Sequence, residues 1–289
     1  MKTLTVLITA IFFLSLKSDK PAYQYFTAKG KAVKYAKIVK ACEEADIIFF
    51  GELHNNPIAH WMELSLTKDI FDQREGNIVL GAEMFESDNQ LIMNEYLEGL
   101  IRQKDFEKEM RLWPNYETDY KPLVEFAKEH QLPFVATNIP RRYASLVNRE
   151  GLEGLEKLSP EAKQYLPPLP VIFVDSLKIY KEMADMMKGS GMSHVTNNIV
   201  KAQAIKDASM AYFILNNLPG SGGAFIHFNG SYHSKDHQGI IWYIKEKHPG
   251  LKIVTISCVE QEDISNLEEE NKGEADYILV IPGDMTKTY

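Results

Sequence analysis

The chain has 289 residues, enough for one large domain or for a core domain with a substantial insertion. Hydrophobic residues make up 45% of it and charged residues 25%, which is typical of a soluble globular protein. The 40 acidic and 32 basic residues leave a net charge of −8. This balance argues against a nucleic-acid partner or an anionic membrane surface, because both require clustered lysine and arginine.

The first twenty residues have the pattern of a secretory signal. Lys2 precedes an apolar run over residues 4–16, and a polar stretch follows at 17–20. Such a run suits the apolar segment of a signal peptide and is shorter than a membrane span, which needs roughly 20 residues. We therefore predict a signal peptide over residues 1–20 and export, to a periplasmic or membrane-associated location. No cysteine follows the run, so no lipobox is seen; an uncleaved anchor or a buried first strand is the alternative.

Six short apolar runs predict buried strands, at residues 46–50, 77–82, 133–137, 223–228, 251–258 and 277–281. Most are apolar throughout rather than alternating, which indicates a sheet covered on both faces. Helical patterns lie between them. The first follows Asn56-Pro57, a good helix start, and repeats Ile58, Met62 and Leu66 at every fourth position. The pattern predicts an α/β fold, with a mainly parallel sheet and flanking helices.

The middle of the chain is richer in helical patterns than the rest. Within one α/β domain spanning residues 21–289, we predict a smaller helical insertion at about 151–193. Proline-rich residues 166–170 and the glycines at 189 and 191 mark breaks in it. The two cysteines, Cys42 and Cys258, belong to no metal-binding motif and are expected to be buried apolar residues.

Polar residues follow three of the predicted strands at the point where each strand ends. Two strands lead into Gly-x-x-His motifs, which end at His54 and His233, and a third ends in Gly-Ala-Glu83. In open α/β sheets, ligands bind beyond the carboxyl ends of the strands. We therefore expect Glu52, His54, Glu83 and His233 to gather at one edge of the sheet.

These residue types allow two kinds of chemistry. Imidazole and carboxylate ligands suit a divalent metal such as zinc, iron or manganese. Alternatively, two neighbouring carboxylates would have pKa values pushed apart, which gives an acid and a base for catalysis. Glu52, His54, Glu83 and His233 are thus candidates both as metal ligands and as catalytic groups. The competing interpretation is that Glu52 and His54 cap the next helix and that His233 is an ordinary surface histidine.

Four further polar residues are expected to support the site. Gln203 and Asp207 are four residues apart on an otherwise apolar helix, where they could orient a histidine. Asn138 and Arg141 follow another strand, and the arginine could meet a substrate carboxylate or phosphate. Exposed polar positions are the alternative for all four. The side chain of His60 could face the site or water.

The helical insertion carries a cluster of methionines together with Tyr180 and His194. Methionine adapts to irregular apolar ligands, and phenolate and imidazole are both axial ligands of haem iron. Tyr180, Met183 and His194 are therefore candidates for gripping a flat macrocycle. The competing interpretation is that Tyr180, Met183 and Met187 form only the apolar stripe of a helix.

Several blocks of the sequence, in this order, resemble those of the ChaN-type iron-regulated, haem-binding proteins. They are residues 51–57 (GELHNNP), 81–85 (GAEMF), 120–125 (YKPLVE), 135–140 (VATNIP), 203–207 (QAIKD) and 230–233 (GSYH). The resemblance spans about residues 45–260. ChaN-like proteins belong to the Tiki superfamily, which also includes metalloproteases and erythromycin-esterase-like hydrolases. The pattern shared by that superfamily maps onto Glu52, His54, Glu83 and His233.

The resemblance implies a parallel-sheet domain with a smaller helical part, exported in bacteria and associated with haem or iron acquisition. Its expected partners are haem, an outer-membrane uptake receptor and a second copy of the chain. The residues themselves also allow a metal-dependent hydrolase, in which a metal-bound water attacks an amide or ester of a peptide or small molecule. Whether the protein is an enzyme stays open at this point.

Overall fold

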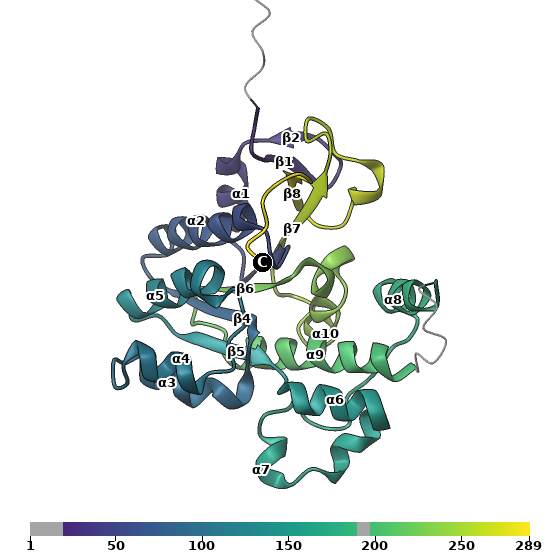
Figure 1. Cartoon of the computed structure of the whole chain (residues 1–289). Coiled ribbons are helices and arrows are strands. Elements are labelled where there is room, and N and C mark those ends of the chain that lie inside the picture. Colours follow the sequence, from purple (N-terminus) through teal and green to yellow (C-terminus); the bar gives the residue numbers. More distant parts are fainter. Residues whose placement is uncertain (1–19, 190–196) are drawn as a thin grey trace, which may run out of the picture.

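The computed structural model describes residues 20–189 and 197–289, and its strands form one eight-stranded sheet (Figure 1). The strands are β1 (Gln24–Thr27), β2 (Ala32–Val33), β3 (Ile47–Glu52), β4 (Ile78–Glu86), β5 (Phe134–Asn138), β6 (Ala224–Gly230), β7 (Ile253–Gln261) and β8 (Tyr277–Pro282). Their order across the sheet is β2-β1-β8-β7-β3-β6-β4-β5. Strands β3 to β8 pair in parallel, whereas β1 is antiparallel to β2 and β8. The predicted α/β fold with a mainly parallel sheet is confirmed.

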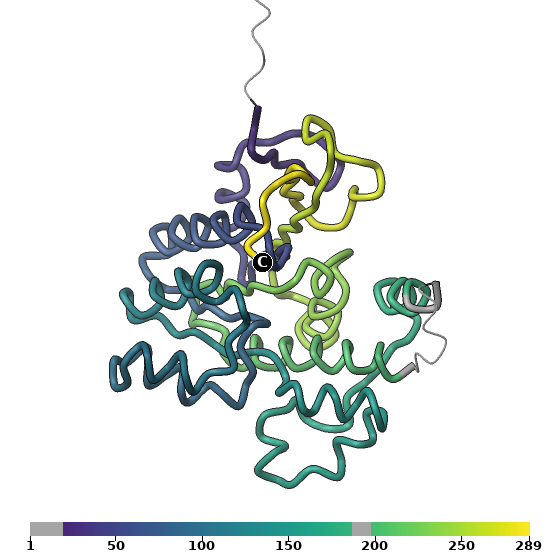
Figure 2. The backbone as a smooth tube through the Cα atoms, in the orientation of Figure 1, coloured from purple at the N-terminus to yellow at the C-terminus, as the bar shows by residue number. Residues whose placement is uncertain are grey.

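All six predicted strands are present, and two short edge strands were not predicted. β1 and β2 span only four and two residues, so neither is long enough to show a strand pattern by itself. β1 pairs antiparallel with β8, which comes from the far end of the chain, and β2 pairs antiparallel with β1. The last residues also return to the middle of the molecule (Figure 2), where the Thr288 amide donates to the carbonyl of Asn55.

Helices cover both faces of the sheet. The α-helices are α1 (Tyr35–Cys42), α2 (Pro57–Gln73), α3 (Gln90–Leu97), α4 (Gln103–Glu109), α5 (Lys121–Glu129), α6 (Arg141–Glu150), α7 (Pro160–Lys163), α8 (Lys178–Gly189), α9 (Asn197–Asn216) and α10 (Ile240–Lys247). Shorter helical turns are η1 (Ser87–Asn89), η2 (Tyr116–Tyr120), η3 (Leu152–Lys157), η4 (Ser231–His233), η5 (Lys235–His237) and η6 (Glu269–Asn271). Helices α1, α2 and α5 pack on one face, and α9 and α10 pack on the other.

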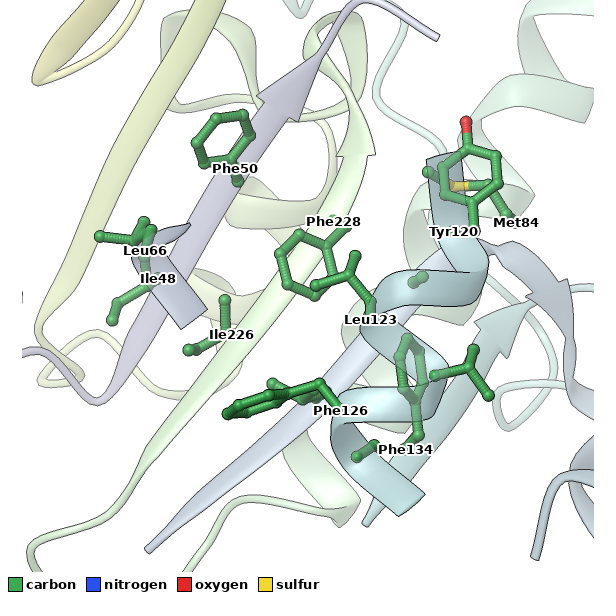
Figure 3. Packing of buried hydrophobic residues seen from close by; sticks show 14 of the residues in the cluster. Ile48, Phe50, Leu66, Met84, Tyr120, Leu123, Phe126, Phe134, Ile226 and Phe228 are labelled. Atoms are coloured by element: carbon green, nitrogen blue, oxygen red, sulfur yellow. The ribbon is translucent and has the colours of Figure 1, made fainter. Parts of the chain in front are cut away.

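The first four residues of the central strand β3 are all apolar because both faces of the sheet are covered. Ile48 and Phe50 face the core under α2 and α5, whereas Ile47 and Phe49 face the core under α9 and α10. Figure 3 shows Phe50 and Phe228 within the first of these cores. Burying one such side chain contributes about 1.5–3 kcal/mol. Because both faces of the sheet are covered, each residue of β3 is buried.

Helix α2 begins as its sequence predicts. Asn56 is the N-cap, and its side-chain oxygen accepts hydrogen bonds from the amides of Ile58 and Ala59, while Pro57 occupies the first turn. This start fixes the loop between β3 and α2, which carries His54. The cap therefore positions a candidate site residue as well as a helix.

The segment from residue 151 to 189 holds η3, α7 and α8; η3 packs against α6 and α9, and α8 packs against α9. The remainder of the predicted insertion, residues 190–193, and nearly all of the predicted signal peptide lie outside the described residues. Both cysteines are buried and unpaired. Within the described part of the chain, no helix has the length and apolar character needed to cross a membrane.

Candidate functional site

A cavity of about 590 Å³ opens beyond the carboxyl ends of β3, β4 and β6. These strands are adjacent in the sheet, and Glu52 lies opposite Gly230 in the register of β3 and β6. The parallel pairing thus brings the strand-end residues to one place. The residues that line the cavity are Glu52, Leu53, His54, Glu83, Glu86, Trp113, Asn138, Ile139, Arg141, Met183, Met186, Gln203, Lys206, Gly230, Ser231, Tyr232 and His233.

Glu52 and His54 form a carboxylate–histidine pair on the first wall. Nδ1 of His54 donates to Oε1 of Glu52 at 2.6 Å, and the Tyr120 hydroxyl donates to the same oxygen at 2.8 Å. Glu52 is buried, while the side chain of His54 is 36% exposed, beside the ring of Trp113. Since Nδ1 is occupied, Nε2 is the ring nitrogen of His54 that remains free to bind a ligand.

Burial controls the protonation of this pair. Loss of solvent, together with the neighbouring carboxylate of Glu63, raises the pKa of Glu52 to about 8. Burial alone would lower the pKa of His54, but its hydrogen bond and charge interaction with Glu52 outweigh burial and raise that pKa. The proton between the two side chains is therefore held firmly.

Glu83, His233 and Asp207 form a second, more deeply buried group. Nε2 of His233 lies 3.1 Å from Oε1 of Glu83, and Nδ1 lies 2.5 Å from Oδ1 of Asp207. The other oxygen of Glu83 accepts from the Gly230 amide at 2.9 Å. Asp207 also accepts from the Tyr180 hydroxyl at 2.7 Å. Both nitrogens of His233 are thus held by carboxylates.

The charges of this group follow from its pairing. Burial lowers the pKa of a histidine, but for His233 the carboxylates of Glu83 and Asp207 outweigh it and raise the pKa to about 10. Burial alone would raise the pKa of Glu83, yet the charge and hydrogen bond of His233 hold it well below its usual range. The pair is therefore an imidazolium and a carboxylate at neutral pH.

Gly230 lies between the two pairs. A Cβ atom at this position would lie 2.7 Å from Nε2 of His54 and 3.5 Å from Oε2 of Glu83. The first distance is too short for any real contact, so glycine is required for His54 to lie where it does. This explains in physical terms why the second Gly-x-x-His motif begins with glycine.

The four predicted supporting residues take different places around the site. Asp207 holds His233, and Nε2 of Gln203 lies 2.8 Å from Nε2 of the same ring. The Asn138 side chain donates to the Glu83 carbonyl at 2.9 Å. Arg141 lines the cavity with a side chain that is 79% exposed, so it lies at the mouth.

The two predicted cofactor-binding residues that the structure describes, Tyr180 and Met183, take different places. Met183 lines the cavity, but Tyr180 does not: its ring is buried, and its hydroxyl is bound to Asp207. Tyr180 therefore packs in the interior, as the helix-stripe interpretation expects. His194 lies outside the described residues.

The four strand-end residues are not the group whose ligand atoms lie nearest one another. They form two separate pairs, and the group whose ligand atoms lie within 4.8 Å of one another is instead Glu52, His60 and Glu63. Sequence reasoning left His60 open and missed Glu63. The spacing of His60 and Glu63 was the available signal, because residues three apart on a helix share a face. Glu63 is an acidic residue that adjoins the apolar stripe of α2.

The charge state of His233 can be tested through stability. Its pKa is raised from 6.5 to about 10 on folding, so its stabilisation is complete below about pH 6.5 and is lost as the pH rises through 10. His233→Gln should be about 3 kcal/mol less stable than the native chain at pH 7, because it leaves buried carboxylates unpaired. Between pH 7 and 10 the gap should shrink, by up to about 1.4 kcal/mol per pH unit. Urea unfolding at several pH values measures the stability difference at pH 7 and its change with pH. If the stabilities of the two proteins change with pH in parallel, His233 carries no buried charge.

The fold and the cavity define an α/β protein with a candidate ligand site of histidine–carboxylate pairs at the carboxyl edge of its sheet. Residues 38–244 match a family model described as haem-binding uptake, Tiki superfamily, ChaN. The chain therefore belongs to the ChaN family. A search of curated proteins found no match.

Solved structures share the fold. A structure described as cofacial haem binding to ChaN of Campylobacter jejuni is 15% identical, with a TM-score of 0.65, covering 90% of this chain and 97% of that one. A succinoglycan biosynthesis protein is 11% identical, with a TM-score of 0.51, over 85% of this chain and 90% of that one. An erythromycin esterase variant, EreC, in its open conformation is 11% identical, with a TM-score of 0.50, over 88% and 94%.

Proposed function

We propose that this protein binds haem in the cavity at the carboxyl edge of its sheet, as a step in bacterial iron acquisition. Membership of a haem-binding uptake family supports the ligand. The geometry of His54 supports this location for the haem. Its Nδ1 is bound to a buried carboxylate, while Nε2 is left for a ligand. Export to the periplasm, an outer-membrane receptor and a second copy of the chain as partners belong to the same proposal.

The cavity fits a flat, mostly apolar macrocycle with acidic side groups. Its volume of about 590 Å³ is in the usual range for small-molecule sites. Apolar walls come from five side chains: Leu53, Trp113, Ile139, Met183 and Met186. Aromatic and methionine side chains suit a planar ring. Arg141 and Lys206 also line the cavity, where they could pair with the haem propionates.

His54 is the residue we assign to the haem iron. Imidazole is a common axial ligand of haem. Metal-binding histidines usually donate their second ring N–H to a carboxylate, which fixes the ring and its tautomer, and Glu52 holds His54 in this way. Within the described part of the chain, Nε2 of His54 has no hydrogen-bond partner that would compete with iron.

Haemin titration of the chain from Lys20 onward tests the proposal, because these residues include every described element. We expect a saturable shift of the Soret band, with a fixed number of haems bound per chain. Gel filtration of the complex would show whether binding brings two chains together. Absence of a saturable shift would contradict haem binding outright.

The role of Arg141 and Lys206 gives a separate prediction. Replacing both with glutamine should weaken haemin binding roughly tenfold, since each propionate would lose a charged partner. Haemin dimethyl ester, which has no free carboxylates, should bind the double variant and the native chain equally. Arg149→Gln with Lys201→Gln is the matched control, because these residues lie on the same two helices but do not line the cavity. An equal loss for haemin and its ester would mean that the two cations do not contact the propionates.

A metal-dependent or acid–base hydrolase acting on a peptide or ester is the second candidate. The observation in its favour is that two histidine–carboxylate pairs face one cavity with different protonation, since the pKa of Glu52 is raised and that of Glu83 is lowered. A histidine held by a carboxylate is also a suitable general base. Glu83→Gln should abolish hydrolysis of ester or amide substrates and leave the Soret shift in place. No turnover of such substrates by the native chain would remove this candidate.

A further inference from the structure

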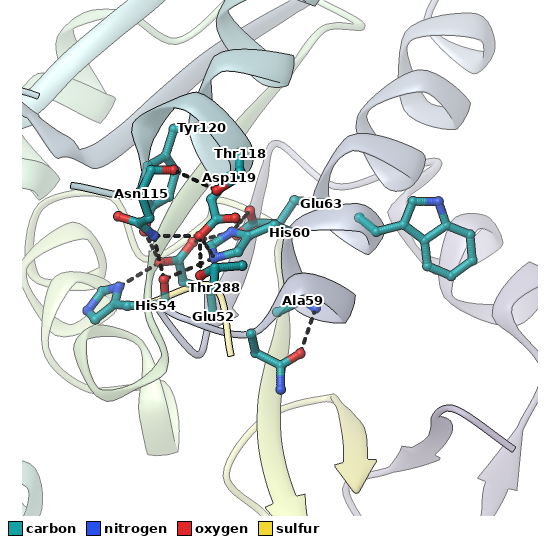
Figure 4. A network of polar contacts seen from close by, with 12 residues as sticks. Glu52, His54, Ala59, His60, Glu63, Asn115, Thr118, Asp119, Tyr120 and Thr288 are labelled. Atoms are coloured by element: carbon teal, nitrogen blue, oxygen red, sulfur yellow. Dashed lines mark hydrogen bonds and ion pairs between the residues drawn. The ribbon is translucent and has the colours of Figure 1, made fainter. Parts of the chain in front are cut away.

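A second group of polar side chains lies behind the cavity, on the far side of Glu52 (Figure 4). Glu52 comes from the end of β3, His60 and Glu63 from the start of α2, and Asp119 from η2. All four are buried, and only Glu52 also lines the cavity. Ligand atoms of Glu52, His60 and Glu63 lie within 4.8 Å of one another, and no other such group occurs among residues 20–189 and 197–289.

The hydrogen bonds of His60 determine which of its nitrogens is free. Nε2 lies 3.1 Å from the backbone carbonyl oxygen of His54, which can only accept, so Nε2 carries a hydrogen. Nδ1 then faces Oε2 of Glu63 at 3.0 Å and Oε2 of Glu52 at 3.4 Å. A bare nitrogen lone pair between two carboxylates would be repelled by both. A proton or a metal ion must therefore lie between Nδ1 and these oxygens.

The carboxylates of this group are not balanced by cationic side chains. Among the described residues, Glu52, Glu63 and Asp119 form ion pairs only with His54 and His60, and with no lysine or arginine. Oε2 of Glu52 and Oε1 of Glu63 have no hydrogen-bond donor at all. Asp119, in contrast, accepts from Asn115 and Thr288. One proton on His60 cannot satisfy both of these oxygens of Glu52 and Glu63, and buried polar oxygens without partners are costly.

We propose that Glu52, His60 and Glu63 bind a divalent first-row transition metal of the zinc or manganese class. One imidazole nitrogen with carboxylate oxygens is a donor set that these metals accept. With metal–ligand bonds of ~2.1 Å, neighbouring ligand atoms in a tetrahedral or octahedral shell lie about 3.0–3.4 Å apart. The two oxygens near Nδ1 of His60 lie at 3.0 and 3.4 Å. The bond from Nε2 of His60 to the His54 carbonyl is the usual support for a metal-binding imidazole.

This metal would also act on the cavity. Oε1 of Glu52 holds His54, whereas Oε2 of the same carboxylate faces His60. A metal on the second oxygen fixes the carboxylate that orients the cavity histidine. The proposed metal and the proposed haem ligand thus share one side chain but occupy separate places.

Metal analysis of the full-length chain tests the proposal without any use of haem. The protein is treated with a chelator, dialysed against Zn²⁺ or Mn²⁺ separately, and assayed for bound metal and thermal midpoint. We expect one equivalent per chain and a rise in the midpoint, because a ligand that binds only the folded state stabilises it. Glu63→Gln should weaken binding by at least about 100-fold, since loss of a metal ligand matches or exceeds loss of its support.

Glu274→Gln is the matched control, because Glu274 is also buried but lies outside the group and pairs with Lys235. It should keep one equivalent of metal. In chelator, Glu63→Gln should melt at or above the midpoint of the native chain, since it removes one of the unbalanced charges, and this shows that the variant folds. The proposal is overturned if the native chain takes up neither metal, or if Glu63→Gln binds as much as the native chain does. The first of these outcomes needs no variant, so a folding failure cannot hide it.

Discussion

His54→Ala should weaken haemin binding by about 10- to 100-fold and shift the Soret band of whatever complex remains. The size of this loss in affinity follows because the variant lacks both an iron ligand and the support that the Glu52 carboxylate gives it. The apolar walls and the two cations of the cavity stay in place, so weak binding should persist. Absorption titration of the variant and the native chain, from the same preparation, measures both effects.

Two controls distinguish the loss of an iron ligand from a general disturbance of the fold. His248→Ala removes an exposed histidine that does not line the cavity and should leave the titration unchanged. Added imidazole should restore the native spectrum of His54→Ala, because the free ligand can occupy the space of the lost ring. If the spectrum of His54→Ala matches that of the native chain, and His194→Ala changes it instead, His194 rather than His54 is the iron ligand.

The core of the sheet was predictable because its pattern is local. A strand buried on both faces needs apolar residues, and β3 shows this from Ile47 to Phe50. The place of the site was predictable for a related reason. Parallel strands end at one edge, so Glu52, Glu83 and His233 had to lie near one another once the strands were identified.

The partners of each side chain were not predictable in the same way. Which carboxylate holds which histidine depends on side-chain directions that no spacing encodes, and Asp207 reaches His233 from helix α9. Asp119 joins the buried group from η2, far along the chain from His60, and no sequence pattern links them. The spacing of Tyr180 favoured the apolar helix stripe over a haem contact, and its burial against Asp207 agrees with that interpretation.

Glu52 connects the two proposed sites. A carboxylate buried so completely is stable only if each of its oxygens has a partner. Oε1 is satisfied by His54 and Tyr120 on the cavity side, while Oε2 has no donor and faces His60 and Glu63. The asymmetry explains why one residue can serve a ligand in the cavity and a cation behind it.

Gly230→Ala should reproduce the loss of haem affinity expected for His54→Ala, although it removes no polar group. Gly230 has φ −52° and ψ 134°, which alanine adopts freely, so the backbone itself causes no strain. The added Cβ would lie 2.7 Å from Nε2 of His54, so the ring must move away from the position that Glu52 gives it. We expect a loss of stability of about 1–3 kcal/mol, as for overpacking in a buried site, and a haemin affinity close to that of His54→Ala.

Gly250→Ala is the appropriate comparison, because a Cβ there meets no atom within 4 Å. Its stability should stay within about 0.5 kcal/mol of the native chain, with an unchanged titration. The double variant Gly230→Ala with His54→Ala then decides the cause. If the clash acts through the histidine ring, the double variant should bind haemin no more weakly than His54→Ala alone, because the two substitutions remove the same interaction. Additive losses would mean that Gly230 contacts the ligand directly and that His54 keeps its place beside an alanine.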